Sequence, residues 1–316
     1  MTSPGAFEVV TFGESMLLLT PVEPGSLEAV GEFRSSIAGA ESNLAIGLAR
    51  LGHSVAWVSR LGRDPFGAKV LKTVRGEGVN VDRVELDDEL PTGLMFKEQL
   101  GHATNVYYYR KNSAASQLSP DQFRGLSARI LFVSGITPGL SENNRDCVLA
   151  VIRKFKETGA EVVFDPNLRL KLWQAANARK VFRQITSLSD LVLPSLAEAE
   201  LIASKGSVEE MADELLALGP GRVAIKAGKQ GAYYRQGLSG EWIPPFPVRE
   251  VDPIGAGDAF CAGVLSGLLD GIPFAEAVRR GCATGALAVT CHGDFGGLPT
   301  RTQLEAFLQN RKPVER

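Results

Sequence analysis

The sequence has few residues of the types that bind metals or form disulfides. Among 316 residues there are four cysteines and three histidines, with no C-x-x-C pair and no histidine spacing typical of a metal site. Each cysteine (Cys147, Cys261, Cys282 and Cys291) lies in an apolar or helical context, which predicts reduced, buried thiols. These absences exclude a zinc-finger protein and a small disulfide-stapled domain.

Long runs of basic residues and long runs of apolar residues are absent too. Lys and Arg number 34 against 36 Asp and Glu, and no basic cluster stands out, so we expect no nucleic-acid partner. No apolar run approaches the roughly 18 residues that a membrane span needs. The first stretch, MTSPGAFEVVTFGES, does not have the pattern of a signal peptide. We therefore predict a cytoplasmic globular protein with no membrane partner.

Two common nucleotide-binding motifs are missing as well. The pattern G-x-x-x-x-G-K-[ST] does not occur, because Gly228-Lys229 is followed by Gln230. The run that begins at Gly255 has Phe260 where G-x-G-x-x-G requires glycine. A P-loop and a dinucleotide-binding turn are therefore disfavoured.

What the sequence does contain is an alternation of β-rich and helical patterns. Runs that are apolar on both faces predict strands at 7–12, 55–59, 130–134, 162–165, 191–194 and 223–226. Apolar residues at three- and four-residue steps predict helices at 41–52, 64–78, 141–159 and 208–219. The alternation predicts an α/β fold: a doubly wound, mainly parallel sheet with helices on both faces.

Two segments, 15–39 and 89–113, break this alternation. They contain the short runs MLLLT, TGLMFKEQ and NVYYYRK, the last two joined by a turn at 100–102. We predict that they form a small β-rich lid, and that 1–14, 40–88 and 114–316 form the α/β domain. Because lid strands have unpaired edges, a homo-oligomer formed through them is expected.

The stretch VDPIGAGDAFCAG, at 251–263, combines a glycine-rich turn with the start of an apolar helix. A helix beginning at about Ala256 leaves its first N–H groups unpaired, and Gly255 and Gly257 allow a ligand to approach the backbone closely. Such a turn favours binding of an anion, above all a phosphate. Asp258, in the first turn, is a candidate proton acceptor. An acidic helix cap is the alternative interpretation.

A second stretch, IAGAESNLAIGLARLG at 37–52, opens another helix with small and polar residues. Together the two stretches resemble both signatures of the ribokinase-like sugar kinases, the phosphofructokinase-B family, and the resemblance covers essentially the whole chain. It implies transfer of the γ-phosphoryl group of ATP to a sugar hydroxyl with Mg²⁺. It also implies that Asp258 is the base, that the amides of Gly255, Ala256 and Gly257 form an anion hole, and that Asp252 lies near a monovalent cation such as K⁺.

The resemblance also implies a nucleotide side of the site. Ser195–Glu198 stands at the place of the family's N-x-x-E motif, with Ser in place of Asn, so Glu198 would act on Mg²⁺ through water. A loop after the strand at 223–226 resembles the family's nucleotide loop, although a solvated turn with two lysines is the alternative. The ATP contacts expected besides the anion hole are Asn167, Arg169, Ser195, Lys226, Gly228, Lys229 and Gly231.

Two arginines, Arg110 and Arg169, suggest an acidic acceptor, because a guanidinium fork pairs with a carboxylate. Strand alternation places Tyr108 and Arg110 on one face, although sheet packing with a solvated charge is the alternative. These residues, with SGITPGLS and NSAASQLSP, resemble the 2-keto-3-deoxygluconate kinases of the same family. The substrate contacts that this implies are Gly39, Ala40, Asn43, Tyr108, Arg110, Arg169, Asp258 and Asp294. For Asp294, a solvent-exposed turn residue is the alternative.

The expected activity is ATP-dependent phosphorylation of the 6-hydroxyl of 2-keto-3-deoxygluconate. A fructokinase- or ribokinase-type kinase of a neutral sugar is the alternative within the class, but it would have no use for the two arginines. A non-catalytic sugar-sensing protein that keeps the kinase fold is the alternative from a different class. Which C4 epimer of the keto acid is preferred does not follow from the sequence.

Overall fold

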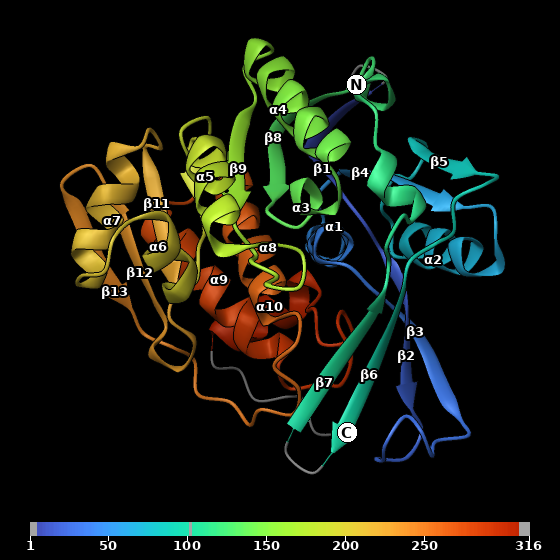
Figure 1. Cartoon of the computed structure of the whole chain (residues 1–316). Coiled ribbons are helices and arrows are strands. Elements are labelled where there is room, and N and C mark those ends of the chain that lie inside the picture. Colours follow the sequence, from blue (N-terminus) through green and yellow to red (C-terminus); the bar gives the residue numbers. More distant parts are fainter. Residues whose placement is uncertain (1–4, 101–102, 310–316) are drawn as a thin grey trace.

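A nine-stranded sheet forms the centre of the computed structural model, which describes residues 5–100 and 103–309. Its strands are β1 (Ala6–Phe12), β4 (Val55–Gly62), β5 (Val84–Asp87), β8 (Ser127–Ser134), β9 (Glu161–Asp165), β10 (Leu191–Val192), β11 (Arg222–Lys226), β12 (Ala232–Gln236) and β13 (Ser239–Ile243). They lie in the order β13-β12-β11-β10-β9-β8-β1-β4-β5 (Figure 1). The pairs from β11 to β5 are parallel, and β12 and β13 add an antiparallel hairpin. The six predicted strands are confirmed.

Helices cover both faces of this sheet, as predicted. They are α1 (Ala40–Arg50), α2 (Pro65–Gly76), α3 (Thr137–Leu140), α4 (Glu142–Glu157), α5 (Ala175–Thr186), α6 (Leu196–Ile202), α7 (Val208–Ala217), α8 (Ala256–Leu269), α9 (Phe274–Ala288) and α10 (Arg301–Leu308). Short 3₁₀ turns lie at Ala114–Gln117, Pro120–Phe123 and Gly228–Gln230.

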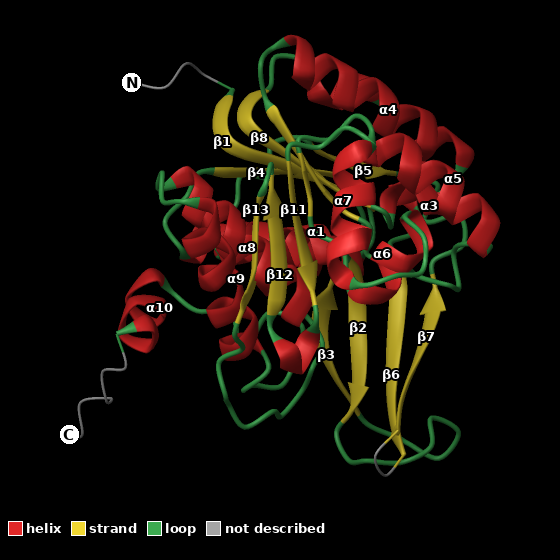
Figure 2. Cartoon of the chain, turned by 90° about the vertical axis from the view of Figure 1, so that its left-hand side faces the viewer, coloured by secondary structure: helices red, strands yellow, loops and turns green. Residues whose placement is uncertain are grey.

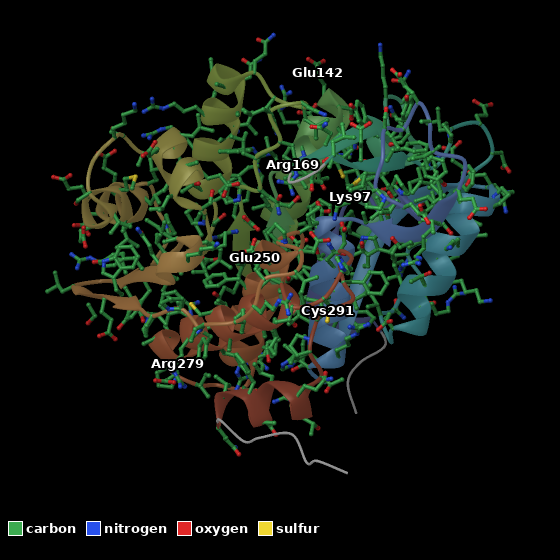
Figure 3. The ribbon with its side chains drawn as sticks, turned by 90° about the horizontal axis from the view of Figure 1, so that it is seen from below. Lys97, Glu142, Arg169, Glu250, Arg279 and Cys291 are labelled. Atoms are coloured by element: carbon green, nitrogen blue, oxygen red, sulfur yellow. The ribbon has the colours of Figure 1, made fainter. Side chains whose placement is uncertain are left out.

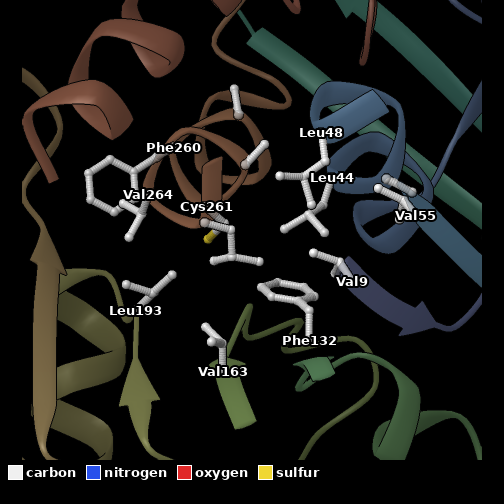
Figure 4. Packing of buried hydrophobic residues seen from close by; sticks show 14 of the residues in the cluster. Val9, Leu44, Leu48, Val55, Phe132, Val163, Leu193, Phe260, Cys261 and Val264 are labelled. Atoms are coloured by element: carbon white, nitrogen blue, oxygen red, sulfur yellow. The ribbon is translucent and has the colours of Figure 1, made fainter. Parts of the chain in front are cut away.

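Alternation along each strand divides the buried residues into two cores. Val9 and Phe132 belong to the core that contains α1, α2, α8 and α9, whereas Val10 and Leu131 belong to the core with α4, α5, α6 and α7. Figure 4 shows side chains of α1 and α8 packed against strand residues of the first core. The strands are therefore buried on both faces, which explains why they are apolar throughout.

A second, four-stranded sheet projects from the α/β body (Figures 1 and 2). It contains β2 (Met16–Pro21), β3 (Phe33–Ala38), β6 (Leu94–Leu100) and β7 (Ala103–Tyr109), in the order β3-β2-β6-β7. The strands come from the two segments predicted as a lid, although the sequence did not single out β3. The predicted turn between β6 and β7 includes residues 101 and 102, which lie outside the described residues.

The predicted burial of the cysteines is confirmed for three of the four. Cys147, Cys261 and Cys282 are buried as predicted, but the prediction is wrong for Cys291, which is exposed because it lies just past the end of α9. None of the described helices is both long and apolar enough to cross a membrane.

The parallel strands place their carboxyl ends along one edge of the large sheet. β1, β9 and β11 all end there; Asn167, just after β9, donates a hydrogen bond to Asp258 of α8, and Lys226, the last residue of β11, lies beside Gly257. In doubly wound sheets this edge is where ligands bind. The edge near the lid is therefore where the candidate site residues converge.

Candidate active site

The turn before α8 has the geometry expected of an anion cradle. The helix begins at Ala256, as predicted, and Gly255 is its N-cap with φ of 80° and no side-chain cap. A Cβ on Gly255 would lie 2.2 Å from the carbonyl oxygen of Asp294, so glycine is needed both for the backbone angle and for the contact. A Cβ on Gly257 would meet only the Lys226 ammonium, at 3.8 Å. The space before the first amides of the helix is therefore open.

Asp258 lies at this helix start as a buried carboxylate. Its Oδ2 accepts a hydrogen bond from Asn43 Nδ2 at 2.8 Å, and its Oδ1 accepts one from Asn167 Nδ2 at 3.2 Å. Burial raises the pKa of Asp258 to about 6, although the Asn43 hydrogen bond and the Arg169 guanidinium lower it. A carboxylate with a raised pKa at the mouth of an anion cradle is suited to accept a proton near neutral pH.

Helix α1 and the end of β9 supply the two residues that hold this carboxylate. Gly39 is the N-cap of α1, and a Cβ there would lie 2.5 Å from the carbonyl oxygen of Glu14. This close packing fixes the first turn of α1, from which Asn43 reaches Asp258. Asn167 has a φ of 38°, a left-handed conformation that Asn tolerates, and it turns the chain back toward α8 immediately after β9.

Behind the cradle, Lys226 places a positive charge beside the first turn of α8. Its Nζ lies 2.8 Å from Asp165 Oδ1, and Asp165 Oδ2 accepts a hydrogen bond from Cys261 Sγ at 3.4 Å. The Asp165 carboxylate raises the pKa of Lys226 against the opposing effect of burial. The ammonium therefore remains charged where it can meet an anion bound at Gly257.

The residues predicted to bind the acceptor come from both the lid and the large sheet. The Arg110 guanidinium lies over the Tyr108 ring at 5.4 Å, so these residues do share one face. Arg110 is nearly buried and pairs with Glu14, which also accepts a hydrogen bond from Ser113. Its Nε has no hydrogen-bond partner among the described residues. Sequence reasoning did not find Glu14, although its place just after β1 was a usable signal.

Arg169 and Asp294 face the same region from two loops. Arg169 is exposed, yet its guanidinium is close enough to lower the pKa of both Asp258 and Asp294. Asp294 is buried, so the alternative of an exposed turn residue is wrong. Burial and the Asp258 charge raise the pKa of Asp294 to about 7, against the effect of Lys97 and Arg169. Figure 3 shows Lys97 and Arg169 near the centre of the view from below.

The predicted nucleotide residues are arranged less compactly. Ser195 and Glu198 form a capping box at the start of α6, and Glu198 Oε1 also accepts a hydrogen bond from the Leu168 amide at 2.7 Å. Lys229 is almost fully exposed and lies 3.4 Å from Glu250, so the structure does not bring it to Asp258. Gly228 and Gly231 turn the chain after β11 with positive φ angles.

Fold and site together define a phosphotransferase of the α/β class, in which an amide cradle faces a buried carboxylate beneath a β lid. A family model for the pfkB family carbohydrate kinases matches residues 6–301, and the chain therefore belongs to this family. The predicted family membership and fold class are confirmed.

Two relatives are similar to this protein over almost the whole chain. The 2-dehydro-3-deoxygluconokinase of Bacillus subtilis is 43% identical, with 97% of each chain covered. The 2-dehydro-3-deoxygalactonokinase of Haloferax volcanii is 36% identical, with 96% of each covered.

Solved structures agree on the fold. A putative ribokinase II of E. coli, in complex with ATP and Mg²⁺, has a TM-score of 0.89 at 25% identity and covers 96% of this chain and 99% of its own. A fructokinase mutant of Vibrio cholerae with fructose, ADP and potassium has a TM-score of 0.85 at 26% identity, with 96% and 98% covered.

Proposed function

We propose that this carbohydrate kinase transfers the γ-phosphoryl group of ATP to the 6-hydroxyl of 2-keto-3-deoxygluconate. The observation that carries the proposal is the set of buried polar atoms without a hydrogen-bond partner in the described part of the chain. Three of these atoms, Asn43 Oδ1, Arg110 Nε and Asp294 Oδ1, belong to residues predicted to bind the acceptor. Because unpaired buried polar atoms are costly, they indicate a polar ligand. The similarity to the Bacillus enzyme supports the same substrate.

Each of the three atoms can form a hydrogen bond with a polar group of a sugar acid. Arg110 Nε is a donor that can meet a carboxylate or keto oxygen, and Arg169 adds a second guanidinium on this side. Asn43 Oδ1 can accept a hydrogen bond from a hydroxyl group, since Asn43 Nδ2 is already engaged with Asp258. Asp294, with a pKa of about 7, can donate from its protonated form or accept from its ionised form. The close packing at Gly39 would bring the backbone of Gly39 and Ala40 against the sugar.

In the proposed reaction the 6-hydroxyl lies between Asp258 and the γ-phosphorus. Its oxygen forms a bond to phosphorus while the bond from phosphorus to the β,γ-bridging oxygen breaks, and ADP leaves with that electron pair. The hydroxyl proton passes to an oxygen of Asp258. The amides of Gly255, Ala256 and Gly257 and the ammonium of Lys226 would stabilise the negative charge on the transferred group, the Ala256 amide giving up its 3.4 Å hydrogen bond to the Pro253 carbonyl.

The residues present fit Mg²⁺ bound mainly through ATP. No group of three or more acidic, histidine or cysteine side chains that could hold a metal occurs among the described residues. Mg²⁺ usually keeps several waters and takes one or two carboxylates besides phosphate oxygens. Glu198, whose carboxylate is near enough to Asp165 to affect its pKa, would hold one of those waters. When bound, the ion neutralises phosphate charge.

The lid and the nucleotide loop complete the proposal. We infer that segments 15–39 and 89–113 close over the acceptor and exclude water, which would otherwise compete for the phosphoryl group. Ser195 and the loop from Lys226 to Gly231 would line the ATP side, with Lys229 moving to reach it. Exposed Tyr107 and Tyr109 lie on β7, which is an edge strand of the lid sheet within the described residues; they support a homo-oligomer formed through the lid, which light scattering would test.

A substrate panel tests the function. ADP release is measured with the gluconate-derived keto acid, its galactonate epimer, fructose and ribose, for the wild type and for Arg169→Met and Arg110→Met. Loss of one charge-assisted contact should cost about 1.5–3 kcal/mol, or roughly 10- to 150-fold in kcat/KM for the keto acid. Neutral sugars should lose far less. Arg124→Met, at an exposed arginine, is the matched control.

Two results would contradict this assignment. Equal losses on acidic and neutral sugars would mean that the arginines do not bind the acid group, and a raised KM for ATP in Arg169→Met would assign that residue to the nucleotide. Faster turnover of fructose or ribose than of either keto acid would replace the acidic substrate with a neutral one.

A further inference from the structure

A lysine of the lid reaches the turn that forms the anion cradle. Strand β6 alternates, so that Phe96 and Glu98 line an open pocket on one side while Met95 and Lys97 face the other side and are buried. The Lys97 side chain crosses from the lid to the α/β body, where its Nζ lies 2.6 Å from Asp252 Oδ2. The side chains of both residues are about 5% exposed. This is a buried ion pair between two parts of the chain that are 155 positions apart.

Asp252 connects the two loops that shape the site. Its Oδ1 accepts a hydrogen bond from the amide of Ile254 at 3.2 Å, within the turn that leads into α8. Its Oδ2 accepts one from the amide of Gly293 at 3.4 Å, next to Asp294. The position of this carboxylate therefore sets the relation between the cradle and the acceptor side. A buried carboxylate needs a nearby positive charge, and Lys97 provides it.

We propose that the Lys97 ammonium takes the place of the monovalent cation that the family resemblance puts near Asp252, so that phosphoryl transfer by this protein does not require K⁺. The residues present do not fit an additional cation there. Oδ2 is already in contact with the ammonium and Oδ1 is engaged by the Ile254 amide, and a second positive charge would repel the first. A relative, the fructokinase of Vibrio cholerae, was solved with potassium.

Lys97 acts here as a positioning residue. It does not touch the reacting atoms, but it holds Asp252, and Asp252 holds the turn that presents the amides of Ala256 and Gly257. The same ammonium lowers the pKa of Asp294. Because Lys97 belongs to β6, the charge reaches the cradle only when the lid is seated. Packing of the lid against the α/β body and ordering of the turn before α8 are therefore coupled through Lys97.

The first experiment compares cations on the wild-type protein. Activity and thermal unfolding are measured in about 0.1 M KCl and in tetramethylammonium chloride of the same ionic strength. Both kcat/KM and Tm should agree between the two salts, within roughly twofold for kcat/KM, since no cation site linked to folding is expected. An increase of kcat/KM by about fivefold or more in KCl would overturn the proposal, and this comparison requires no variant.

The second experiment removes the ammonium. Lys97→Met keeps most of the apolar stem, and Lys72→Met, at an exposed lysine of α2, is the matched control. In tetramethylammonium, Lys97→Met should lose roughly 10- to 100-fold in kcat/KM, because a buried carboxylate has lost its partner. KCl or methylammonium chloride should restore at least about tenfold and raise the Tm of this variant alone. Unchanged activity, or a loss that neither salt restores, would overturn the proposal.

The activity measurements rest on the proposed function, but the unfolding measurements do not. If the protein phosphorylates a different sugar, the dependence of Tm on the cation still reports on Asp252 and Lys97. A failure of the substrate assignment is therefore distinguishable from a failure of the proposal for Lys97. If Lys97→Met does not fold in any salt, the comparison of KCl with tetramethylammonium chloride on the wild-type protein tests the proposal by itself.

Discussion

Replacing Asp258 with asparagine should lower kcat by orders of magnitude while stabilising the fold. Burial raises the pKa of Asp258 from an ordinary value of 3.8 to about 6, which means that the folded protein resists its ionisation. A shift of about two pH units corresponds to about 3 kcal/mol. The new amide is uncharged and avoids this cost. Asn43 Oδ1 has no partner among the described residues, so rotation of the Asn43 side-chain amide lets it accept a hydrogen bond from the new amide.

The pH dependence of the effect follows from linkage. Because the folded-state pKa is raised, ionisation of Asp258 costs no stability below pH 3.8, costs progressively more up to pH 6, and costs the full amount above pH 6. At pH 8, Asp258→Asn should therefore be more stable than the wild type by about 1–3 kcal/mol, the lower value allowing for weaker hydrogen bonds. For a chain of this length that is roughly 2–5 °C in Tm. At pH 5 the gain should be about half as large.

Two measurements on Asp258→Asn test the predicted gain in stability and the predicted loss of activity. Scanning calorimetry at pH 8 and pH 5 gives the stability, and ADP release gives kcat, which should fall by roughly 10²–10⁴-fold. Asp88→Asn, the same substitution at an exposed carboxylate, should change neither. A variant that is less stable than the wild type at pH 8 would refute the inference that ionised Asp258 lowers the free energy of unfolding. Activity within about tenfold of the wild type would refute its role as the base.

Two further predictions concern the same helix start. In the wild type, kcat/KM should fall about tenfold per pH unit below pH 6, because protonated Asp258 cannot accept a proton; a profile that stays flat to pH 5 would contradict this. Gly257→Val should fold normally, because only the Lys226 ammonium lies near the added carbon, but it should raise the KM for ATP by roughly tenfold or more, since the side chain fills the cradle. Unchanged ATP kinetics in a folded Gly257→Val protein would place the cradle elsewhere.

The parts of the fold that local patterns determine could be predicted from the sequence. The strands of the large sheet are buried on both faces, so each gives a short apolar run, and the α8 start is marked by Gly255 directly before Ala256. Turn chemistry and periodicity act over a few residues, which is why a single sequence reveals them.

The contacts that were missed join distant parts of the chain. A lysine on a lid strand is usually solvated, and nothing near Lys97 in the sequence indicates that Asp252 receives it. In the same way, the pair formed by Glu14 and Arg110 joins the end of β1 to the lid segment, and no local pattern indicates it. Lys97 does lie on the same side of β6 as buried Met95, and this alternation is a local signal of its burial that sequence reasoning did not use.

The contact between Gly255 and Asp294 limits how the specificity of this enzyme can be engineered. The α-carbon of Gly255 lies directly against the backbone carbonyl of Asp294, and Asp252 bonds to the amide of Gly293 in the same turn. Grafting the turn at 291–296 from a relative with another sugar would therefore displace the backbone that we propose receives the phosphate. Libraries that vary side chains at Asp294 or Tyr108 leave that backbone in place. Changes of acceptor are then best sought through side chains and not through exchange of loops.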